Sequence, residues 1–151
     1  MPIQNLTDFT PKLEGNHSSF VSEENKRRHV GENPDKLFCR LYKVDGYILA
    51  SQTGKRCDYL LVNDEGKDAY FVELKGVHID DAIEQIDATI EALENSLVGY
   101  FFFRRIICSK AGTHKLKSSR VQFWRKKHNQ KHHGQQAVII KENQHSDKMV
   151  R

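Results

Sequence analysis

Two short apolar segments that each contain a carboxylate constrain this chain more than any other part of its sequence. Residues 56–62 read Arg-Cys-Asp-Tyr-Leu-Leu-Val, and residues 69–76 read Ala-Tyr-Phe-Val-Glu-Leu-Lys-Gly. Their aromatic and aliphatic content is typical of buried strands. Asp58 lies in the first segment, and Glu73 and Lys75 lie in the second. Because a charged side chain in an apolar strand is costly unless it is paired or bound to a metal, we look for function here first.

A hairpin between the two segments would bring their charged residues together. Asn63 and Asp68 enclose four residues of turn-forming composition, Asp-Glu-Gly-Lys. If Asn63 pairs with Asp68, the same register places Asp58 opposite Glu73, with Cβ atoms roughly 5 Å apart. Lys75 lies on that face as well, because it is two residues beyond Glu73. The two carboxylates would repel each other unless a divalent cation such as Mg²⁺ lies between them. A one-residue slip would turn Asp58 to the other face.

The rest of the chain predicts further helices and strands around this hairpin. Residues 79–95 form the clearest amphipathic helix, since apolar residues recur there every three or four positions. Residues 99–108 predict a long buried strand, which a helical connection would place parallel to the second hairpin strand. The remaining predicted elements are a short helix at 22–30, a helix from Asn33-Pro34-Asp35 to Tyr42, a strand at 47–50, a basic helix at 118–131 and a strand at 137–140.

This order predicts an α/β fold with a mixed central β-sheet flanked by helices. Its core is helix, three strands, helix and strand (αβββαβ), followed by a basic C-terminal extension. The opposite face of the hairpin is apolar too, which predicts central strands covered on both sides. We expect residues 1–20 to be a flexible N-terminal arm, residues 21–142 to be a single domain and residues 143–151 to be a tail.

Charge is distributed unevenly along the chain. Residues 102–151 contain 13 Lys or Arg and two acids, a net charge of +11, whereas residues 1–101 contain 11 Lys or Arg and 18 Asp or Glu, a net charge of −7. A basic surface is the usual footprint of phosphate-backbone binding, and a solvated basic tail is the alternative. The residues that we expect to contact a nucleic acid are Arg56, Arg104, Arg105, Lys115, Lys117, Arg120, Arg125, Lys126 and Lys127.

The composition argues against several other classes of protein. The three cysteines are far apart and form no zinc pattern, so we interpret them as reduced, buried residues of a cytoplasmic protein. No apolar run reaches the ~18–20 residues that a membrane span needs, and the first residues do not resemble a signal peptide.

Histidines and aromatic residues near the C-terminus leave two further alternatives open. His114, His128, His132 and His133 suggest zinc, but they lack neighbouring cysteines or acids and fit a polar, basic surface better. Phe123 and Trp124 either stack on nucleic-acid bases or pack their helix onto the core.

The residues around the hairpin resemble the PD-(D/E)xK nuclease superfamily, which includes restriction-endonuclease-like and Holliday-junction-resolvase-like proteins. Asp58 precedes Glu73-Leu74-Lys75, a helix follows, and the αβββαβ order matches over roughly Pro34 to Cys108. The resemblance implies a DNA endonuclease in which Asp58, Glu73 and the Leu74 carbonyl bind Mg²⁺ or Mn²⁺. Lys75 would orient the attacking water or help to deprotonate it.

The chain departs from the family pattern at several positions. Cys57 stands where the family name has proline. Some relatives carry a glutamine followed four residues later by tyrosine, whereas Gln85 is followed by Thr89, so Gln85 is either an auxiliary residue or an ordinary boundary residue. Relatives often carry an acid on the first helix, and Glu24 and Glu32 are the candidates for it.

Three alternatives to an active nuclease remain at this stage. Asp58, Glu73 and Lys75 would form a buried ion-pair network if no metal binds. A catalytically inactive nuclease fold would instead act as a nucleic-acid-binding or scaffolding subunit of a larger complex. A protein adaptor would use its basic end to bind an acidic partner. The active protein would work as a homodimer or as a subunit of a larger assembly.

Overall fold

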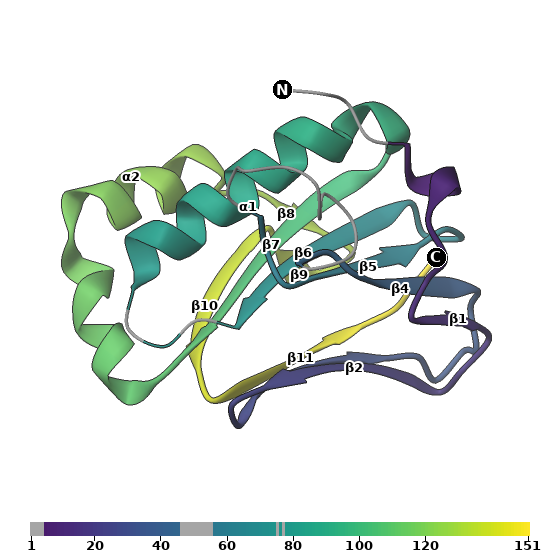
Figure 1. Ribbon diagram of the computed structural model, residues 1–151, viewed down its shortest axis with the longest axis horizontal. Helices are drawn as coiled ribbons and strands as arrows, with labels where there is room; N and C mark the ends of the chain where they lie inside the picture. Colours follow the sequence, from purple (N-terminus) through teal and green to yellow (C-terminus); the bar gives the residue numbers. More distant parts are fainter. Residues whose placement is uncertain (1–4, 46–55, 75, 77) are drawn as a thin grey trace.

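The computed structural model describes residues 5–45, 56–74, 76 and 78–151, apart from the side chains of 111–113 and 115. The described residues form three layers (Figure 1), with two helices above a six-stranded sheet and a three-stranded sheet below it. This arrangement confirms a mixed α/β fold. The strand that we predicted at 47–50 lies outside the described residues.

The elements are as follows. The six-stranded sheet has the order β1 (Leu13–Gly15), β4 (Cys39–Lys43), β5 (Tyr59–Asn63), β6 (Asp68–Leu74), β7 (Phe101–Cys108) and β10 (Val138–Glu142). The three-stranded sheet has the order β11 (Gln144–Lys148), β3 (Arg27–Glu32) and β2 (Ser19–Glu24). A small hairpin joins β8 (Lys131–His132) to β9 (Gln135–Gln136). The helices are α1 (Ile79–Leu93) and α2 (Ser119–Lys127), with 3-10 segments η1 (Leu6–Asp8), η2 (Glu94–Ser96) and η3 (Lys110–Lys117).

The predicted hairpin register is confirmed. β5 pairs antiparallel with β6, with Asn63 opposite Asp68 and Tyr59 opposite Val72. The Asp58 N–H also donates to the Val72 carbonyl, at 3.1 Å, so Asp58 and Tyr59 both lie opposite Val72, as at a β-bulge, and the confirmed register ends at the Tyr59–Val72 pair. Every residue of both strands is buried, as expected for central strands. β7 runs parallel to β6, as predicted from the helical connection between them.

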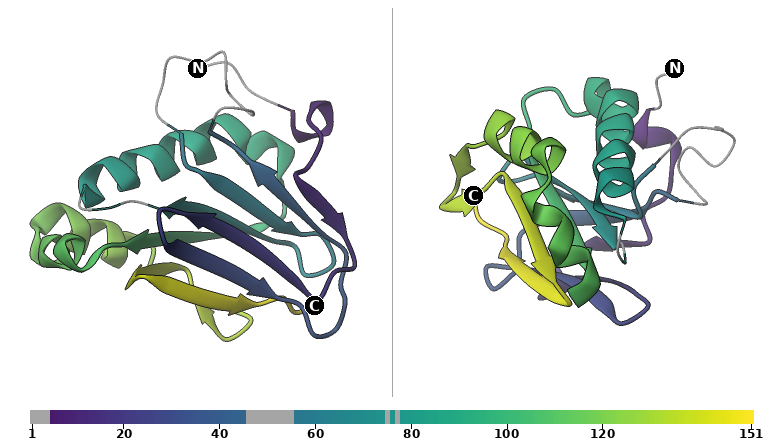
Figure 2. Two further views of the ribbon diagram at one scale, coloured as in Figure 1. Left: turned by 60° about the horizontal axis from the view of Figure 1, so that its bottom comes forward. Right: turned by 90° about the vertical axis from the view of Figure 1, so that its left-hand side faces the viewer.

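Both faces of the six-stranded sheet are covered, but by different layers. The helices α1 and α2 pack on one face, where Ile83, Ile86 and Trp124 join the apolar cluster. The three-stranded sheet covers the other face (Figure 2). Phe20 and Met149 are fully buried there. Among the described residues, therefore, helices flank the sheet on one side only.

The helix predicted at 22–30 is wrong, because these residues form the β2–β3 hairpin. Asn25 and Lys26 both adopt positive φ, at 50° and 68°, between the paired residues Glu24 and Arg27. Two central residues with positive φ make a type I′ turn, whose twist suits a two-residue hairpin. Burial alternates along both strands, which is the period of a strand and not of a helix.

The helix predicted from Asn33 is also wrong, so the expected first helix of the core is absent. The Asn33 side chain is buried and binds both backbone groups of Leu37, accepting from its N–H at 3.0 Å and donating to its carbonyl at 2.8 Å. Lys36 has a positive φ of 54°. Asn33 thus closes a tight turn, and the chain continues directly into strand β4.

The predicted arm and tail both contain paired strands. β1 pairs with β4, which contradicts a wholly flexible segment at 1–20. β11 pairs parallel with β3, and the Asn63 side chain donates to the Val150 carbonyl at 2.8 Å. A Cβ atom at Gly66 would collide with the same carbonyl oxygen. The C-terminal residues are therefore part of the packed structure.

A buried ion pair joins the two sheets. Arg105 of β7 and Asp147 of β11 make two hydrogen bonds, of 2.7 and 3.0 Å. His29 of β3 binds the same carboxylate at 2.8 Å, and His145 binds it at 3.2 Å. The side chains of Arg105, His29 and Asp147 are at most 2% exposed. The Arg105 guanidinium also lies over the stacked rings of Tyr70 and Phe103.

The cysteines and the helices agree with the predictions that can be checked here. Cys39, Cys57 and Cys108 are buried, and each is a free thiol. Within the described ranges, neither α1 nor α2 has the length and apolar content that a membrane crossing requires.

We expect Asp147→Ala to destabilise the protein by about 3–5 kcal/mol, because it leaves the buried Arg105 charge without its partner. Urea unfolding measures this loss, and Asp35→Ala, which removes an exposed carboxylate, is the control. A loss below about 1 kcal/mol, within the range of an exposed ion pair, would show that the pair does not hold the sheets together.

We also expect stability to fall as the pH drops from 7.5 to 5.5. Burial lowers the pKa of His29 from its usual 6.5, although Asp147 acts in the opposite direction. The unfolded chain therefore binds a proton that the folded protein excludes, and one such group costs up to about 1.4 kcal/mol at pH 5.5. Urea unfolding at the two pH values should show a smaller decline for His29→Gln. Equal declines would contradict this assignment.

Candidate functional site

The two predicted acids lie side by side where β5 begins and β6 ends. Asp58 immediately precedes β5, and its Oδ2 accepts a hydrogen bond from the Leu74 N–H at 2.8 Å. Glu73 lies in β6 and is 2% exposed. The paired register ends at Tyr59 and Val72, so Asp58 and Glu73 lie next to the last pair, at the same end of the hairpin.

Glu24 joins these acids from the second sheet. It is the last residue of β2, and its carboxyl shares a hydrogen bond with the Asp58 carboxyl. Burial raises the pKa of Asp58 to about 6; the Leu74 N–H lowers it, whereas Glu24 and Asp45 raise it further. The Lys43 Nζ lies 3.7 Å from the Glu24 Oε1 and forms an ion pair with it. We predicted Glu24 as an auxiliary acid on a helix. In the structure it is the last residue of a strand.

Helix α1 borders the same acids. The Thr89 hydroxyl accepts from the Cys57 N–H at 2.8 Å and donates to the Gln85 carbonyl at 2.7 Å. Helical spacing places Gln85 on the same stripe as Thr89. The Gln85 side-chain oxygen is buried, and no hydrogen-bond partner for it occurs among the described residues. An orphaned buried amide oxygen is unusual and is suited to bind a group that enters the site.

Cys57 is buried beside these acids. Burial raises the pKa of its thiol, and the Glu73 charge raises it further. Its Sγ contacts the Tyr59 carbonyl at 3.4 Å. Cys57 therefore packs as a small buried residue between the start of β5 and helix α1.

Three other predicted site residues have different outcomes. Lys75 lies outside the described residues, so its role stays a prediction. The Leu74 N–H donates to Asp58, whereas the role of the Leu74 carbonyl as a metal ligand stays a prediction. Arg56 binds the exposed Asp45 through Nε at 3.1 Å, which keeps a guanidinium close to the acids.

Two arginines predicted to contact a nucleic acid are buried fully or in part. Arg105 is fully buried and paired with Asp147, so the prediction for it is wrong. Its position in β7 turns it toward the second sheet rather than toward solvent. Arg104 is partly buried and donates to the Phe102 carbonyl at 3.3 Å, and burial lowers its pKa.

The remaining basic residues gather at α2 and the segment before it. Lys126 and Lys127 are exposed and Arg125 is partly exposed, all three in the last turn of α2. Lys117 is exposed, Arg120 pairs with Glu84 at 3.0 Å, and the Lys115 side chain is not described.

The two aromatic residues of α2 behave differently. Phe123 is 69% exposed and, together with Arg125 and Lys126, lines a surface hollow of about 390 Å³. Trp124 is buried, and its indole N–H donates to Asp87 at 3.1 Å. Only Phe123 is therefore available for stacking on a base.

Sequence reasoning missed one cluster of ionisable side chains. His132 and His133 both contact Asp68, at 2.9 and 2.8 Å. No local pattern joins them, because Asp68 precedes the histidines by 64 and 65 residues. The turn signal His-His-Gly was the available clue. His114 is exposed, and His128 packs against Trp124.

No protein-family model, curated protein or solved structure matches this chain.

We expect Asp58→Asn to raise the melting temperature of the metal-free protein by roughly 2–4 °C, the effect of about 1 kcal/mol in a chain of this size. Asparagine still accepts from the Leu74 N–H, and its amide can donate to Glu24, so the variant removes only the crowded charge. The same substitution should abolish any stabilisation by Mg²⁺.

Differential scanning calorimetry with and without Mg²⁺ measures both effects. Glu91→Gln removes an exposed acid of α1 and is the matched control. A lower melting temperature for Asp58→Asn, with the Mg²⁺ effect retained, would contradict a cation site at these acids.

Proposed function

We propose that this protein is a metal-dependent nuclease that hydrolyses phosphodiester bonds in DNA. The observation that supports this most directly is the β5–β6 hairpin, which brings Asp58, directly before β5, and Glu73, near the end of β6, to the same end of the hairpin. Glu24 adds a third acid whose carboxyl shares a hydrogen bond with Asp58. Such crowding of carboxylates is unfavourable in the metal-free protein and becomes favourable when a divalent cation binds.

The order of elements is consistent with a restriction-endonuclease-like core. Strands β4, β5 and β6, helix α1 and strand β7 follow one another as in the resemblance noted above. In this proposal the β2–β3 hairpin replaces the missing first helix. Glu24, at the end of β2, then supplies the acid that relatives often carry on that helix.

The acids would hold Mg²⁺ or Mn²⁺ with the Leu74 carbonyl as a further ligand. When bound, such an ion polarises the scissile phosphate and lowers the pKa of a coordinated water. Asp58 and Glu73 would hold the ion, and Gln85 would offer its buried amide oxygen to the ion or to its water. Lys75 would orient the attacking water and stabilise the developing negative charge.

The surface around α2 would hold the DNA backbone. Lys126 and Lys127 are exposed cations at the end of the helix, and Phe123 projects beside them. Cations supply the salt-dependent phosphate contacts, and an exposed aromatic ring stacks on an unpaired base. This combination favours DNA with single-stranded or branched regions.

We expect Mg²⁺-dependent cleavage of labelled linear, circular or branched DNA by the wild-type protein. Glu73→Gln, Asp58→Asn and Lys75→Ala should each reduce the rate at least roughly a hundredfold, the lower end of what one group in proton transfer contributes. Glu91→Gln should cleave like the wild type. Cleavage of the circular substrate would identify an endonuclease.

DNA binding by the Glu73→Gln variant separates the proposal from its alternatives. Fluorescence anisotropy at several salt concentrations should give a steep salt dependence, and Lys126→Glu with Lys127→Glu should weaken binding and reduce that slope. Binding by the wild-type protein without any cleavage would favour an inactive nucleic-acid-binding or scaffolding subunit. Neither binding nor cleavage would overturn the proposal.

A further inference from the structure

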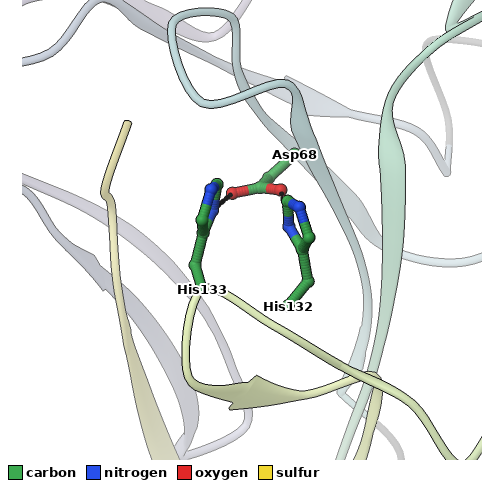
Figure 3. Close-up of side chains that lie close together, drawn as sticks. All are labelled: Asp68, His132 and His133. Carbon is green, nitrogen blue, oxygen red and sulfur yellow. Dashed lines mark hydrogen bonds and ion pairs between the residues drawn. The ribbon is translucent and has the colours of Figure 1, made fainter.

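Asp68, His132 and His133 form a compact cluster away from the acids described above. The Asp68 carboxylate is fully buried at the start of β6, and each of its oxygens faces one imidazole (Figure 3). His132 Nδ1 lies 2.9 Å from Oδ1, and His133 Nδ1 lies 2.8 Å from Oδ2. The two rings are 3.9 Å apart between centroids.

The backbone of the β8–β9 hairpin is shaped to bring both histidines to one side. His132 pairs with Gln135, so His133 and Gly134 are the two central residues of the turn. Both have positive φ, 52° for His133 and 75° for Gly134. Adjacent residues of a regular strand point to opposite faces, and positive φ is uncommon for a residue other than glycine. The turn thus overrides the strand alternation that would separate the two rings.

The ligand atoms lie at nearly the spacing that a bound metal requires. Among the described residues, these three are the group of His, Cys, Asp or Glu side chains whose ligand atoms all lie within 4.8 Å of one another. Around a tetrahedral Zn²⁺ with ligand distances of about 2.0–2.1 Å, neighbouring ligand atoms are roughly 3.3 Å apart. The observed contacts need to open by only about half an ångström, and a carboxylate with two imidazoles suits zinc and similar ions.

We propose that Asp68, His132 and His133 bind a divalent transition-metal ion, such as Zn²⁺, at a site separate from Asp58 and Glu73. A metal ion would take the place of the two N–H hydrogens that now face the carboxylate. His132 stacks on Phe101, with 4.7 Å between ring centroids, which fixes the orientation of one ligand.

The site leaves room for a further ligand. The side chains of His132 and His133 are 38% and 21% exposed. They border a hollow of about 440 Å³ that is also lined by Lys67 and Tyr100. Water can therefore complete the coordination of the ion from the solvent side, as in sites with three protein ligands.

This cluster and the acidic site lie at opposite ends of β6. Asp68 is the first residue of that strand and Glu73 is the last but one, which separates them by roughly 16 Å along it. Their odd spacing turns them to opposite faces of the sheet. An ion at Asp68 would therefore cross-link the β8–β9 hairpin to the central sheet and would not take part in chemistry at Glu73.

Co²⁺ titration of the chelator-treated protein tests this site, because the visible absorption of Co²⁺ distinguishes four-coordinate from six-coordinate ions. We expect a single four-coordinate ion per chain. His132→Gln and His133→Asn should each weaken its binding at least roughly tenfold. Asparagine is chosen at His133 because it tolerates positive φ. The exposed His114→Gln is the matched control and should bind like the wild type.

Two further measurements complete the test. Zn²⁺ should raise the melting temperature of the wild type and of His114→Gln but not of His132→Gln. Glu73→Gln should keep the Co²⁺ site, which separates this proposal from the nuclease proposal. Absence of Co²⁺ binding to the wild type, or equal binding to His132→Gln, would overturn it and leave the cluster as a hydrogen-bonded contact of the hairpin. Both histidines are partly exposed, so these variants should fold even where Asp68→Asn does not.

Discussion

The buried pair between Arg105 and Asp147 is the interaction on which the layered structure depends. It is a bidentate contact between the central sheet and the second sheet, and His29 from a third strand completes it. A buried charge pair of this kind adds little stability compared with apolar packing, but losing one partner is severe. Its presence fixes β11 beside β3 and thereby closes the second sheet over the central strands.

That closure has a direct consequence for the candidate site. The second sheet includes the β2–β3 hairpin, whose end carries Glu24 to the Asp58 carboxyl. The acids of the site therefore come from two sheets rather than from one hairpin. A disturbance at Asp147 would move Glu24 as well as reduce stability, although the pairing of β5 with β6 beside Asp58 and Glu73 does not involve Asp147.

The two ends of β6 have different chemical characters. At its C-terminal end, oxygen ligands gather beside the start of α1, and such a set suits Mg²⁺. At its N-terminal end, Asp68 faces two imidazoles, a set that suits zinc-like ions. The proposed nuclease site and the proposed hairpin site thus have ligand sets that favour different metal ions. Either ion can therefore be removed while the other stays bound.

Local signals in the sequence determined the hairpin, its register and helix α1. The four-residue turn predicted which strand positions face each other, and the structure confirms this from Asn63–Asp68 to Tyr59–Val72. The apolar stripe of α1 shows a period near 3.6. The missing first helix shows the limit of such signals, because Asn33 follows the pattern of a helix cap but closes a tight turn onto Leu37.

Only the tertiary structure decided the second sheet, the burial of Arg105 and the cluster at Asp68. The sequence of β11 is polar, and its buried positions are satisfied by partners more than forty residues away, as Asp147 is by Arg105. A hydrophobic pattern cannot detect a strand whose inward residues are charged. His132 and His133 meet Asp68 for the same reason: the contact depends on where the fold places a distant hairpin, and no local property of the chain encodes it.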